Sequence, residues 1–453
     1  MSASPTTEPP RPSWRDDRWA LGLVALAGIV ASVTWGAVTR PMGDSASYRL
    51  SGQVLADGWG ALTERTPAYP SLLWLTGSLR SETTLLFVVQ LGLHLAAVVI
   101  CVRVAGRIGV PTVWRVALTV LLLMPAPMVK VVYSGSEALA ELLVVAVLWC
   151  FVSWLDEPRV ARLVAMGAAV GLLALTRPTF EILAVPLAVL VWFVARRRRP
   201  APMPDGPSEV RGPGPAVAAW CVALPALVLI GSLVVANGLR FGSWGTTPLQ
   251  GWYLGSRTSL FVERLEPDRD GVRDVLVAER DRRLLLGPGT DAENYQFGIR
   301  TELARRTGLT GTALDAYMTD LNVGLIRSHP FDYLDAVTRS AERYVQIDAQ
   351  PAAAGPGRWG AWAQSALHYL LLVAFLVPAV TVPGLALRGE VGGRVLAVLG
   401  CCAVIVGTCA LVTWAVQTGS SRLRAPTDPL LALMLVTGWW VLTTRRHTSG
   451  APT

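Results

Sequence analysis

Residues 19–49 read WALGLVALAGIVASVTWGAVTRPMGDSASYR, and this stretch decides the fold class. Residues 19–38 contain no charged side chain, and a helix of about 20 apolar residues crosses the hydrocarbon core of a bilayer. Residues 39–49 then contain two arginines, a proline and a lone aspartate, Asp44. The stretch therefore predicts a transmembrane helix that ends in a polar segment at the membrane surface.

The rest of the chain has the same alternation of apolar and charged segments. Of its 453 residues, 52% are hydrophobic and only 16% are charged, whereas a soluble protein has about 25% charged residues. Ten blocks are long enough to span, near 19–38, 83–105, 113–132, 137–155, 160–176, 179–195, 216–237, 363–387, 393–414 and 426–443. We predict an all-α polytopic membrane protein with about ten transmembrane helices.

The distribution of arginine predicts the orientation, because cytoplasmic loops are enriched in Lys and Arg. With the N-terminus inside, the inner segments hold 17 arginines and the short outer loops hold eight basic residues. The apolar segment 67–79 is too short to span. We interpret it as an interfacial or re-entrant helix on the outer face, since counting it as a span would invert everything after it. Both termini are then cytoplasmic in the plasma membrane.

This topology divides the chain into seven segments. They are a disordered N-terminus (1–18), a transmembrane catalytic module (19–195) with its first outer loop (39–82), a cytoplasmic linker rich in proline and glycine (196–215), a transmembrane helix (216–237), a large outer loop (238–362), the C-terminal transmembrane helices (363–443) and a cytoplasmic tail (444–453). Within the large loop, residues 329–345 have the pattern of an amphipathic helix lying on the membrane surface.

Several classes of function are not supported. The net charge of +8 follows from the arginine-rich inner segments and does not indicate nucleic-acid binding. The six cysteines lie within predicted spans, and the four histidines have no ligand spacing, so we expect no metal site. We place Trp59, Trp244, Trp252 and Tyr253 mainly in an interfacial aromatic belt, with stacking on sugar rings as the alternative.

Charged residues at membrane depth are costly and therefore indicate function. Those at the outer ends of the spans are Asp44, Glu64, Arg65, Lys130, Glu137, Glu141, Arg177, Glu181, Arg422 and Arg424. Arginines bind phosphate through paired, charge-assisted hydrogen bonds, and a carboxylate accepts a proton from a hydroxyl. The pattern favours an outward-facing site that holds a phosphate next to a general base.

Seven short motifs carry a family resemblance. They are Gly43-Asp44-Ser45-(x2)-Tyr48, Arg65-Thr66-Pro67-(x)-Tyr69-Pro70, Ser134-(x2)-Glu137, Leu175-Thr176-Arg177-Pro178, Asn237-(x3)-Phe241-Gly242, His329-Pro330-(x2)-Tyr333 and Arg422-Leu423-Arg424-(x)-Pro426. Their order resembles the GT-C glycosyltransferases, in particular the bacterial branch related to protein mannosyltransferases and aminoarabinose transferases (family 39). The motifs cover most of residues 40–443.

The resemblance implies transfer of a monosaccharide from a polyprenyl-phosphate donor to a cell-envelope glycan, lipid or protein acceptor outside the cytoplasm. It implies that Asp44 is the general base and that Arg65, Arg177, Arg422 and Arg424 bind the donor phosphate. We add Lys130 to the phosphate-binding set from its location. As acceptor or sugar contacts we name Glu64, Glu137, Tyr48 and Tyr69. No cofactor is expected, and a need for a divalent cation stays open.

The chain departs from the family pattern at two positions. Many relatives have a second acid beside the first, where this chain has Ser45; either Glu64 or Glu137 substitutes for it, or one acid suffices. Leu423 replaces the usual tyrosine between two arginines. Both differences concern recognition of the acceptor rather than the reaction class.

Each candidate also has an alternative structural role. Asp44 is a good N-cap for the helix that follows it, Arg177, Arg422 and Arg424 can reach lipid headgroups, and Glu141 can be a paired structural carboxyl. The alternative function is a transporter or flippase, or a non-catalytic scaffold, for lipid-linked sugars. The clustering of deep polar residues on the outer side favours the transferase.

Overall fold

The computed structural model describes residues 17–198, 212–267, 271–286, 295–346, 357–417 and 419–448. Most of the predicted N-terminal segment (1–16) and of the predicted linker (199–211) lies outside the described residues. Regular structure in the described ranges is helical, apart from one isolated parallel bridge between Arg40 and Tyr133. The predicted all-α fold class is confirmed.

All ten predicted apolar segments form helices. They are α1 (Arg18–Trp35), α4 (Thr84–Arg107), α5 (Thr112–Leu122) with α6 (Pro125–Met128), α7 (Glu137–Asp156), α8 (Val160–Ala174), α9 (Ala184–Arg197), α10 (Pro215–Phe241), α19 (Gly357–Leu387), α20 (Gly393–Val416) and α21 (Asp428–Thr448). In the described part of the chain, eight helices are long and apolar enough to cross a membrane, or nine if one bent pair counts as a single span. The predicted count of ten is therefore not confirmed.

Two of the ten predicted segments, 113–132 and 160–176, do not form single span-length helices. Proline explains both cases. The residue before a proline is pushed out of the helical region, and Arg177, before Pro178, is extended with φ −145° and ψ 119°. Helix α8 therefore ends after 15 residues, at Ala174. Met124, before Pro125, is likewise extended, and the helices on either side of this break meet at 52°.

Small residues let the helices of the bundle approach closely. A Cβ added to Gly167 of α8 would lie 2.3 Å from the carbonyl oxygen of Val222 on α10. One turn later, a Cβ on Gly171 would lie 2.7 Å from a methyl carbon of Leu229. Glycines four residues apart are a recurrent feature of membrane helix interfaces, and here they bring α8 against α10.

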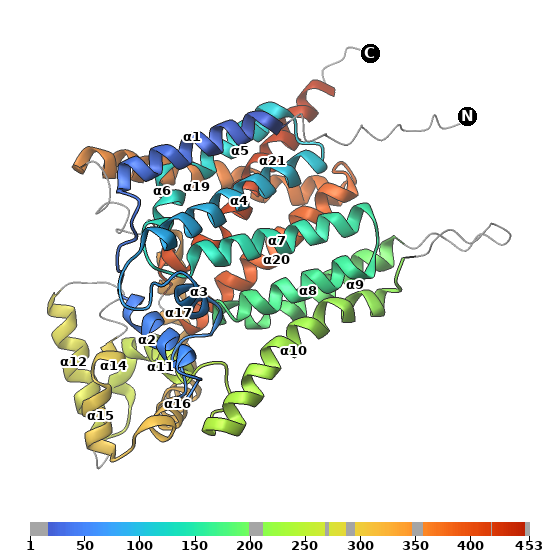
Figure 1. Cartoon of the computed structure of the whole chain (residues 1–453). Helices are drawn as coiled ribbons and strands as arrows, with labels where there is room; N and C mark the ends of the chain where they lie inside the picture. Colours follow the sequence, from blue (N-terminus) through green and yellow to red (C-terminus); the bar gives the residue numbers. More distant parts are fainter. Residues whose placement is uncertain are drawn as a thin grey trace.

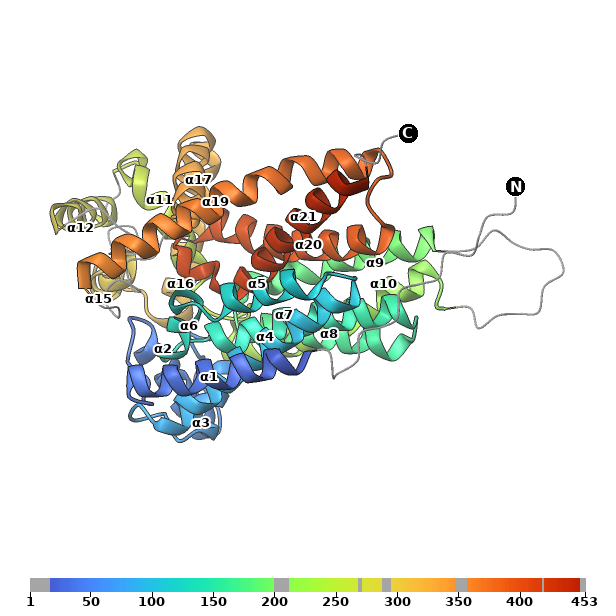
Figure 2. The ribbon, with the colours of Figure 1, turned by 90° about the horizontal axis from the view of Figure 1, so that it is seen from above.

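The extramembrane helices gather at one end of the bundle, and the start of α1 and the end of α21 lie at the other (Figure 1; Figure 2). They are α2 (Ser45–Ala56), α3 (Ala68–Leu75), α11 (Gln250–Thr258), η4 (Ser259–Arg264), α12 (Val272–Leu286), α14 (Tyr295–Gly298), α15 (Arg300–Thr307), α16 (Gly311–Ser328) and α17 (Pro330–Val345). Helices α11 to α16 share a separate core around the fully buried Trp252 and Tyr295. We refer to residues 242–346 as the loop domain.

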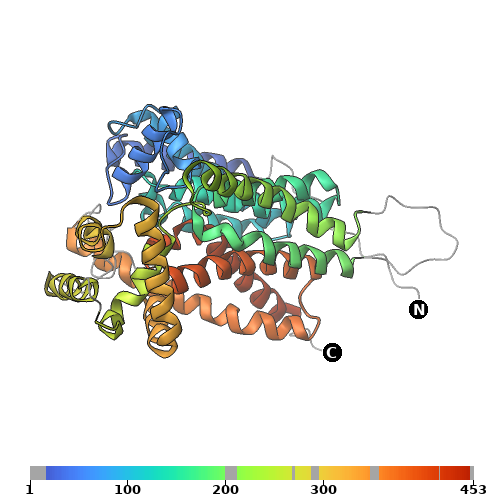
Figure 3. The same ribbon diagram turned by 90° about the horizontal axis from the view of Figure 1, so that it is seen from below.

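Two extramembrane helices bear directly on the sequence predictions. Helix α3 has eight residues and exposes Trp74 and Leu75, which fits a short surface helix and is far less than a span. Helix α17, at the same end in Figure 3, exposes Phe331 but buries Tyr344 against Trp414 of α20. The single apolar face predicted for 329–345 is therefore divided, because part of it packs on the bundle.

Candidate active site

The chain between α1 and α2 brings Asp44 to the end of the bundle. Gly36 ends α1 with a left-handed φ of 78°. The backbone N–H of Arg40 then donates to the carbonyl of Val132, and Arg40 accepts from the N–H of Ser134. This short bridge holds the segment against the chain that leads into α7. Helix α2 begins immediately after Asp44.

The side chain of Asp44 contacts arginines and does not cap α2. Its Oδ1 accepts from Arg65 at 2.7 Å, and its Oδ2 lies 2.9 Å from Nη1 of Arg422. It makes no capping hydrogen bond, although it occupies the N-cap position. About a third of the side chain, 35%, is exposed, so the carboxylate remains accessible to a second molecule.

Arg65 is held on three sides. Its Nε donates to Ser47 at 2.7 Å, and its guanidinium lies 4.9 Å from the centre of the Tyr48 ring. Nη1 of Arg65 lies 3.4 Å from the hydroxyl of Tyr253, which comes from α11 in the loop domain. Since most of this side chain is buried, its direction is set before any ligand binds.

Arg422 joins Asp44 to a second acid. Its Nε donates to Oε1 of Glu137 at 2.7 Å, and Nη1 of Arg177 lies 3.4 Å from the same oxygen. Glu137 is the first residue of α7 and is buried, a position where the helix dipole favours negative charge. The five side chains form a continuous row in the order Arg65, Asp44, Arg422, Glu137 and Arg177, which we call the charge row.

The charge row contains three arginines and two carboxylates, so its formal charge is +1 with all five ionised. Burial alone would raise the pKa of Asp44, but the positive charges of Arg65 and Arg422, with a contribution from Arg177, hold it well below the ordinary value. Asp44 is therefore ionised in the free protein. This surplus positive charge lies beside Asp44, the most exposed side chain of the row.

Other predicted site residues lie outside the charge row. Glu64 pairs with Arg300 of α15 at 2.9 Å. Arg424 donates to the carbonyl of Tyr344 at 2.7 Å and lies 3.3 Å from Asp428. These contacts direct Glu64 toward the loop domain and Arg424 toward α17 and α21.

The predicted contacts Tyr48 and Tyr69, and the predicted phosphate ligand Lys130, are all buried. The two tyrosine rings pack edge to face at 4.9 Å. The Tyr69 hydroxyl donates to Gln90 at 2.8 Å, and Tyr48 supports Arg65 as described above. Lys130 pairs with Glu141 at 2.9 Å, so Glu141 is a paired carboxyl, as its structural alternative proposed.

Two aromatic residues of α11 have contacts that the sequence does not predict. Tyr253 was placed in an aromatic belt, yet its hydroxyl faces Arg65. Trp252 was placed there too, but it is fully buried and donates to Asp315 at 2.8 Å, so the belt interpretation is wrong for Trp252. In the sequence, only their position in a long polar loop between two spans indicated a role for these residues. That position does not predict which residues they contact.

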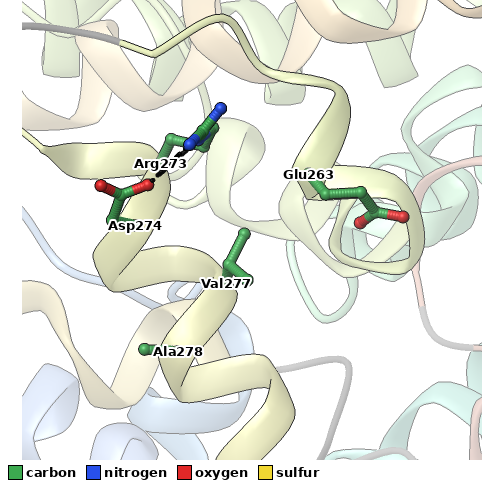
Figure 4. Close-up of a pocket in the computed structure, with 5 residues that line it drawn as sticks. All are labelled: Glu263, Arg273, Asp274, Val277 and Ala278. Atoms are coloured by element: carbon green, nitrogen blue, oxygen red, sulfur yellow. Dashed lines mark hydrogen bonds and ion pairs between the residues drawn. The ribbon is translucent and has the colours of Figure 1, made fainter.

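A surface hollow of about 340 Å³ lies between η4 and α12 (Figure 4). Glu263, Arg273, Asp274, Val277 and Ala278 line it. None of the residues predicted for the site lines this hollow, and Arg273 faces its neighbour Asp274 at 3.0 Å. The described residues also contain no group of three or more His, Cys, Asp or Glu side chains arranged to hold a metal ion.

Comparison with solved structures reveals the fold. The oligosaccharyltransferase AglB from Archaeoglobus fulgidus, in complex with an inhibitory peptide and a dolichol-phosphate, matches with a TM-score of 0.50 and 13% identity, over 97% of this chain and 53% of AglB. The apo form of the A. fulgidus enzyme gives a TM-score of 0.49 and 14% identity, over 97% and 52% of the two chains. ArnT from Cupriavidus metallidurans bound to undecaprenyl phosphate gives 0.36 and 14%, over 96% and 79%.

No family model matches the sequence, and no curated protein matches it either. The chain spans about half the length of AglB. At this identity, the likeness to AglB concerns the fold. The fold is GT-C-like, as the resemblance predicted, and the chain is a multi-pass helical membrane protein.

Proposed function

We propose that this protein is a membrane glycosyltransferase that moves a monosaccharide from a polyprenyl-phosphate donor to an acceptor on the outer face of the cytoplasmic membrane. The observation that carries the proposal is the placement of Asp44, whose two carboxylate oxygens contact Arg65 and Arg422 at one end of a GT-C-like bundle. A candidate base thus lies in direct contact with two candidate phosphate ligands.

The charge row suits the changes of charge in this reaction. The bond between the anomeric carbon of the sugar and the phosphate oxygen breaks, and the acceptor oxygen forms the new bond to that carbon. The acceptor's proton passes to Asp44, and the lipid phosphate leaves with one additional negative charge. Arginines fixed near the departing oxygen stabilise this developing charge most strongly in the transition state.

Donor binding also makes Asp44 a better base. A phosphodiester attracts Arg65 and Arg422, which in the free protein are engaged by carboxylates. A phosphate bound to these arginines offsets the positive charge that depresses the pKa of Asp44. Asp44 then becomes more basic at the stage when it must accept a proton.

The carrier and the acceptor are part of the same proposal. The fold shared with AglB, whose structure holds a dolichol-phosphate, supports a polyprenyl-phosphate carrier. Transfer of a hexose or pentose rather than an oligosaccharide follows from the motif resemblance to family 39. The acceptor is a cell-envelope glycan, lipid or protein, and both termini are cytoplasmic.

A transfer assay tests the proposal. Membranes that contain the wild-type chain are supplied with a panel of radiolabelled polyprenyl-phosphate sugars and native envelope extract, in parallel with Asp44→Asn. We expect one donor to be consumed by the wild type and its transfer to fall by about 10²–10⁴-fold in the variant, the usual contribution of a general base. Asp57→Asn, which changes an exposed acid at the end of α2, is the matched control.

Two outcomes contradict parts of the proposal. Equal transfer by wild type and Asp44→Asn moves the base to another acid, with Glu64 and Glu137 next to be tested. Failure of both to consume any donor, with envelope extract present and the protein at normal level, replaces the transferase with the transporter or scaffold.

A further inference from the structure

A second set of polar side chains lies one helical turn deeper than Glu137. Glu141 on α7 is fully buried, and Nδ1 of His94 on α4 lies 2.8 Å from its Oε2. Nζ of Lys130, in the short helix η2 (Val129–Val131), lies 2.9 Å from its Oε1. Three elements thus meet at one carboxylate inside an apolar bundle, where charged groups are costly.

Lys130 connects this set to the segment that carries the arginines of the last motif. Its Nζ lies 3.3 Å from the carbonyl oxygen of Ala425, the residue after Arg424. We call residues 421–427, which form η5 (Ser421–Leu423) and η6 (Ala425–Thr427), the arginine segment. In this segment Pro426 and Thr427 are buried, and η6 packs on α7.

We propose that Lys130, Glu141 and His94 form a positioning network that holds the arginine segment and so determines where Arg422 meets a bound phosphate. The proposal goes beyond the proposed function, and its link to phosphate rests on that function. The break between α5 and α6 makes the network possible, because it turns the chain inward shortly before Lys130. Glu141 holds the ammonium of Lys130, and Lys130 holds the backbone next to Arg424.

The geometry separates this role from direct phosphate binding by Lys130. The side chain of Lys130 is only 5% exposed. Two acceptors inside the protein, the carboxylate of Glu141 and the carbonyl of Ala425, engage its Nζ. Arg422, in contrast, is 18% exposed and contacts Asp44 itself. Lys130 therefore acts through Arg422, and a small shift of that guanidinium is enough to lower the rate of transfer.

Limited proteolysis tests the network without any assay of transfer. Arg422 and Arg424 are themselves trypsin sites, so the rate of cleavage after them in the full-length protein in detergent reports local opening of the arginine segment. We compare the wild type with Lys130→Met, Glu141→Gln and the double variant by mass spectrometry. We expect about a tenfold faster cleavage in each single variant, and no further increase in the double variant, because both changes break one network.

The matched control is Arg394→Met. Arg394, near the start of α20, pairs with Asp156, the last residue of α7 and so at the opposite end of that helix from Glu137. Unchanged cleavage in Lys130→Met, or equal acceleration in Arg394→Met, would overturn the proposal. If the single variants do not fold, we instead compare Arg394→Met with a double variant that carries both Lys130→Met and Glu141→Leu. Replacing both partners leaves no uncompensated buried charge.

A binding measurement then separates positioning from direct contact with phosphate. We follow the stabilisation of each variant by a short-chain polyprenyl phosphate in a thermal-shift titration. A positioning network predicts that Glu141→Gln weakens binding as much as Lys130→Met, by about tenfold. Weakening by Lys130→Met alone, with normal cleavage, would make Lys130 a direct ligand and contradict the network. The proteolysis result stands even if the wild type transfers no sugar.

Discussion

At the scale of single residues, Asp44 shows how neighbours determine the chemistry of a carboxylate. Two arginines contact its two oxygens, and they lower its pKa against the opposing effect of burial. A carboxylate with a low pKa is always ionised but is a weak base. In the proposed reaction, Asp44 is therefore a weak base in the free protein and becomes a stronger base when the arginines bind the donor phosphate.

This arrangement predicts different pH profiles for kcat/KM and kcat. Asp44 must be ionised to accept a proton, so activity is lost as pH falls through its pKa. The profile of kcat/KM reports the free enzyme, so its acid limb should lie below about pH 4, the ordinary range of Asp. The acid limb of kcat should lie at higher pH, because the bound phosphate engages Arg65 and Arg422.

The variant Arg422→Gln provides the control for these profiles. Removing one cation beside Asp44 should move the acid limb of kcat/KM upward. If the wild-type limb of kcat/KM lay near neutral pH, or if Arg422→Gln left it in place, Asp44 would not be the group that titrates.

At the scale of elements, an ion-pair brace joins the loop domain to the segment between α2 and α3. Arg300 at the start of α15 reaches Glu64 with one nitrogen and Asp315 of α16 with the other, at 2.9 and 2.8 Å. Asp315 also accepts from the buried Trp252 on α11. Glu64 precedes Arg65, so this brace fixes the backbone next to a member of the charge row.

Breaking the brace should therefore affect the reaction more than the stability of the fold. Glu64 and Arg300 are each about a third exposed, and such ion pairs contribute about 0–1 kcal/mol to stability. The buried Asp315, the second partner of Arg300, keeps the hydrogen bond from Trp252 when Arg300 is replaced. We expect Arg300→Met to lower the rate of sugar transfer by about five- to tenfold through displacement of Arg65. Transfer kinetics and thermal unfolding are measured on the same preparations.

The control for the brace is Arg305→Met on the same helix. Arg305 is exposed and contacts Glu302, within α15. A decrease in transfer as large for Arg305→Met as for Arg300→Met would show that general damage to α15, rather than loss of the brace, causes the effect.

At the scale of the whole molecule, most charged side chains of the bundle lie near its two ends, apart from the buried pair Lys130–Glu141. The loop domain and helix α2, which begins directly after Asp44 of the charge row, lie at one end (Figure 1). At the other, Asp17 pairs with Arg103 and Arg115, and Asp156 pairs with Arg107 and Arg394. The bundle thus has two polar ends with an apolar middle, the arrangement that a bilayer requires of its spanning helices.

The orientation of this bundle is testable with single introduced cysteines. Asp57 follows α2 at the end that carries the charge row, and Arg159 lies in the exposed connection between α7 and α8 at the other. In intact cells an impermeant maleimide should label Asp57→Cys but not Arg159→Cys, and after permeabilisation it should label both. The parent chain gives the background from the six native cysteines.

The opposite labelling pattern would contradict the proposed orientation. If Arg159→Cys were labelled in intact cells and Asp57→Cys only after permeabilisation, the charge row would face the cytoplasm. Transfer on the outer face would then be excluded, although the fold and the contacts in the charge row would stand.

How far the sequence could predict the site differs from residue to residue. Its candidates included all five members of the charge row, since a charged residue at membrane depth stands out against apolar neighbours. The same criterion also selected Lys130 and Glu64, whose partners in the structure are Glu141 and Arg300. The cost of burying a charged side chain indicates that the residue has some role, but it does not indicate which residue that side chain pairs with.

Apolar composition and the length of each block by themselves determined that the chain is a helical membrane protein, because the cost of placing a segment in lipid depends on that segment alone. Pro125 and Pro178 also mark, within the sequence itself, the break between α5 and α6 and the end of α8. Only the tertiary structure decided that Asp44 lies between Arg65 and Arg422 and that Tyr253 reaches Arg65. Such pairs join segments far apart in the chain, and helix packing, which no local pattern encodes, brings them together.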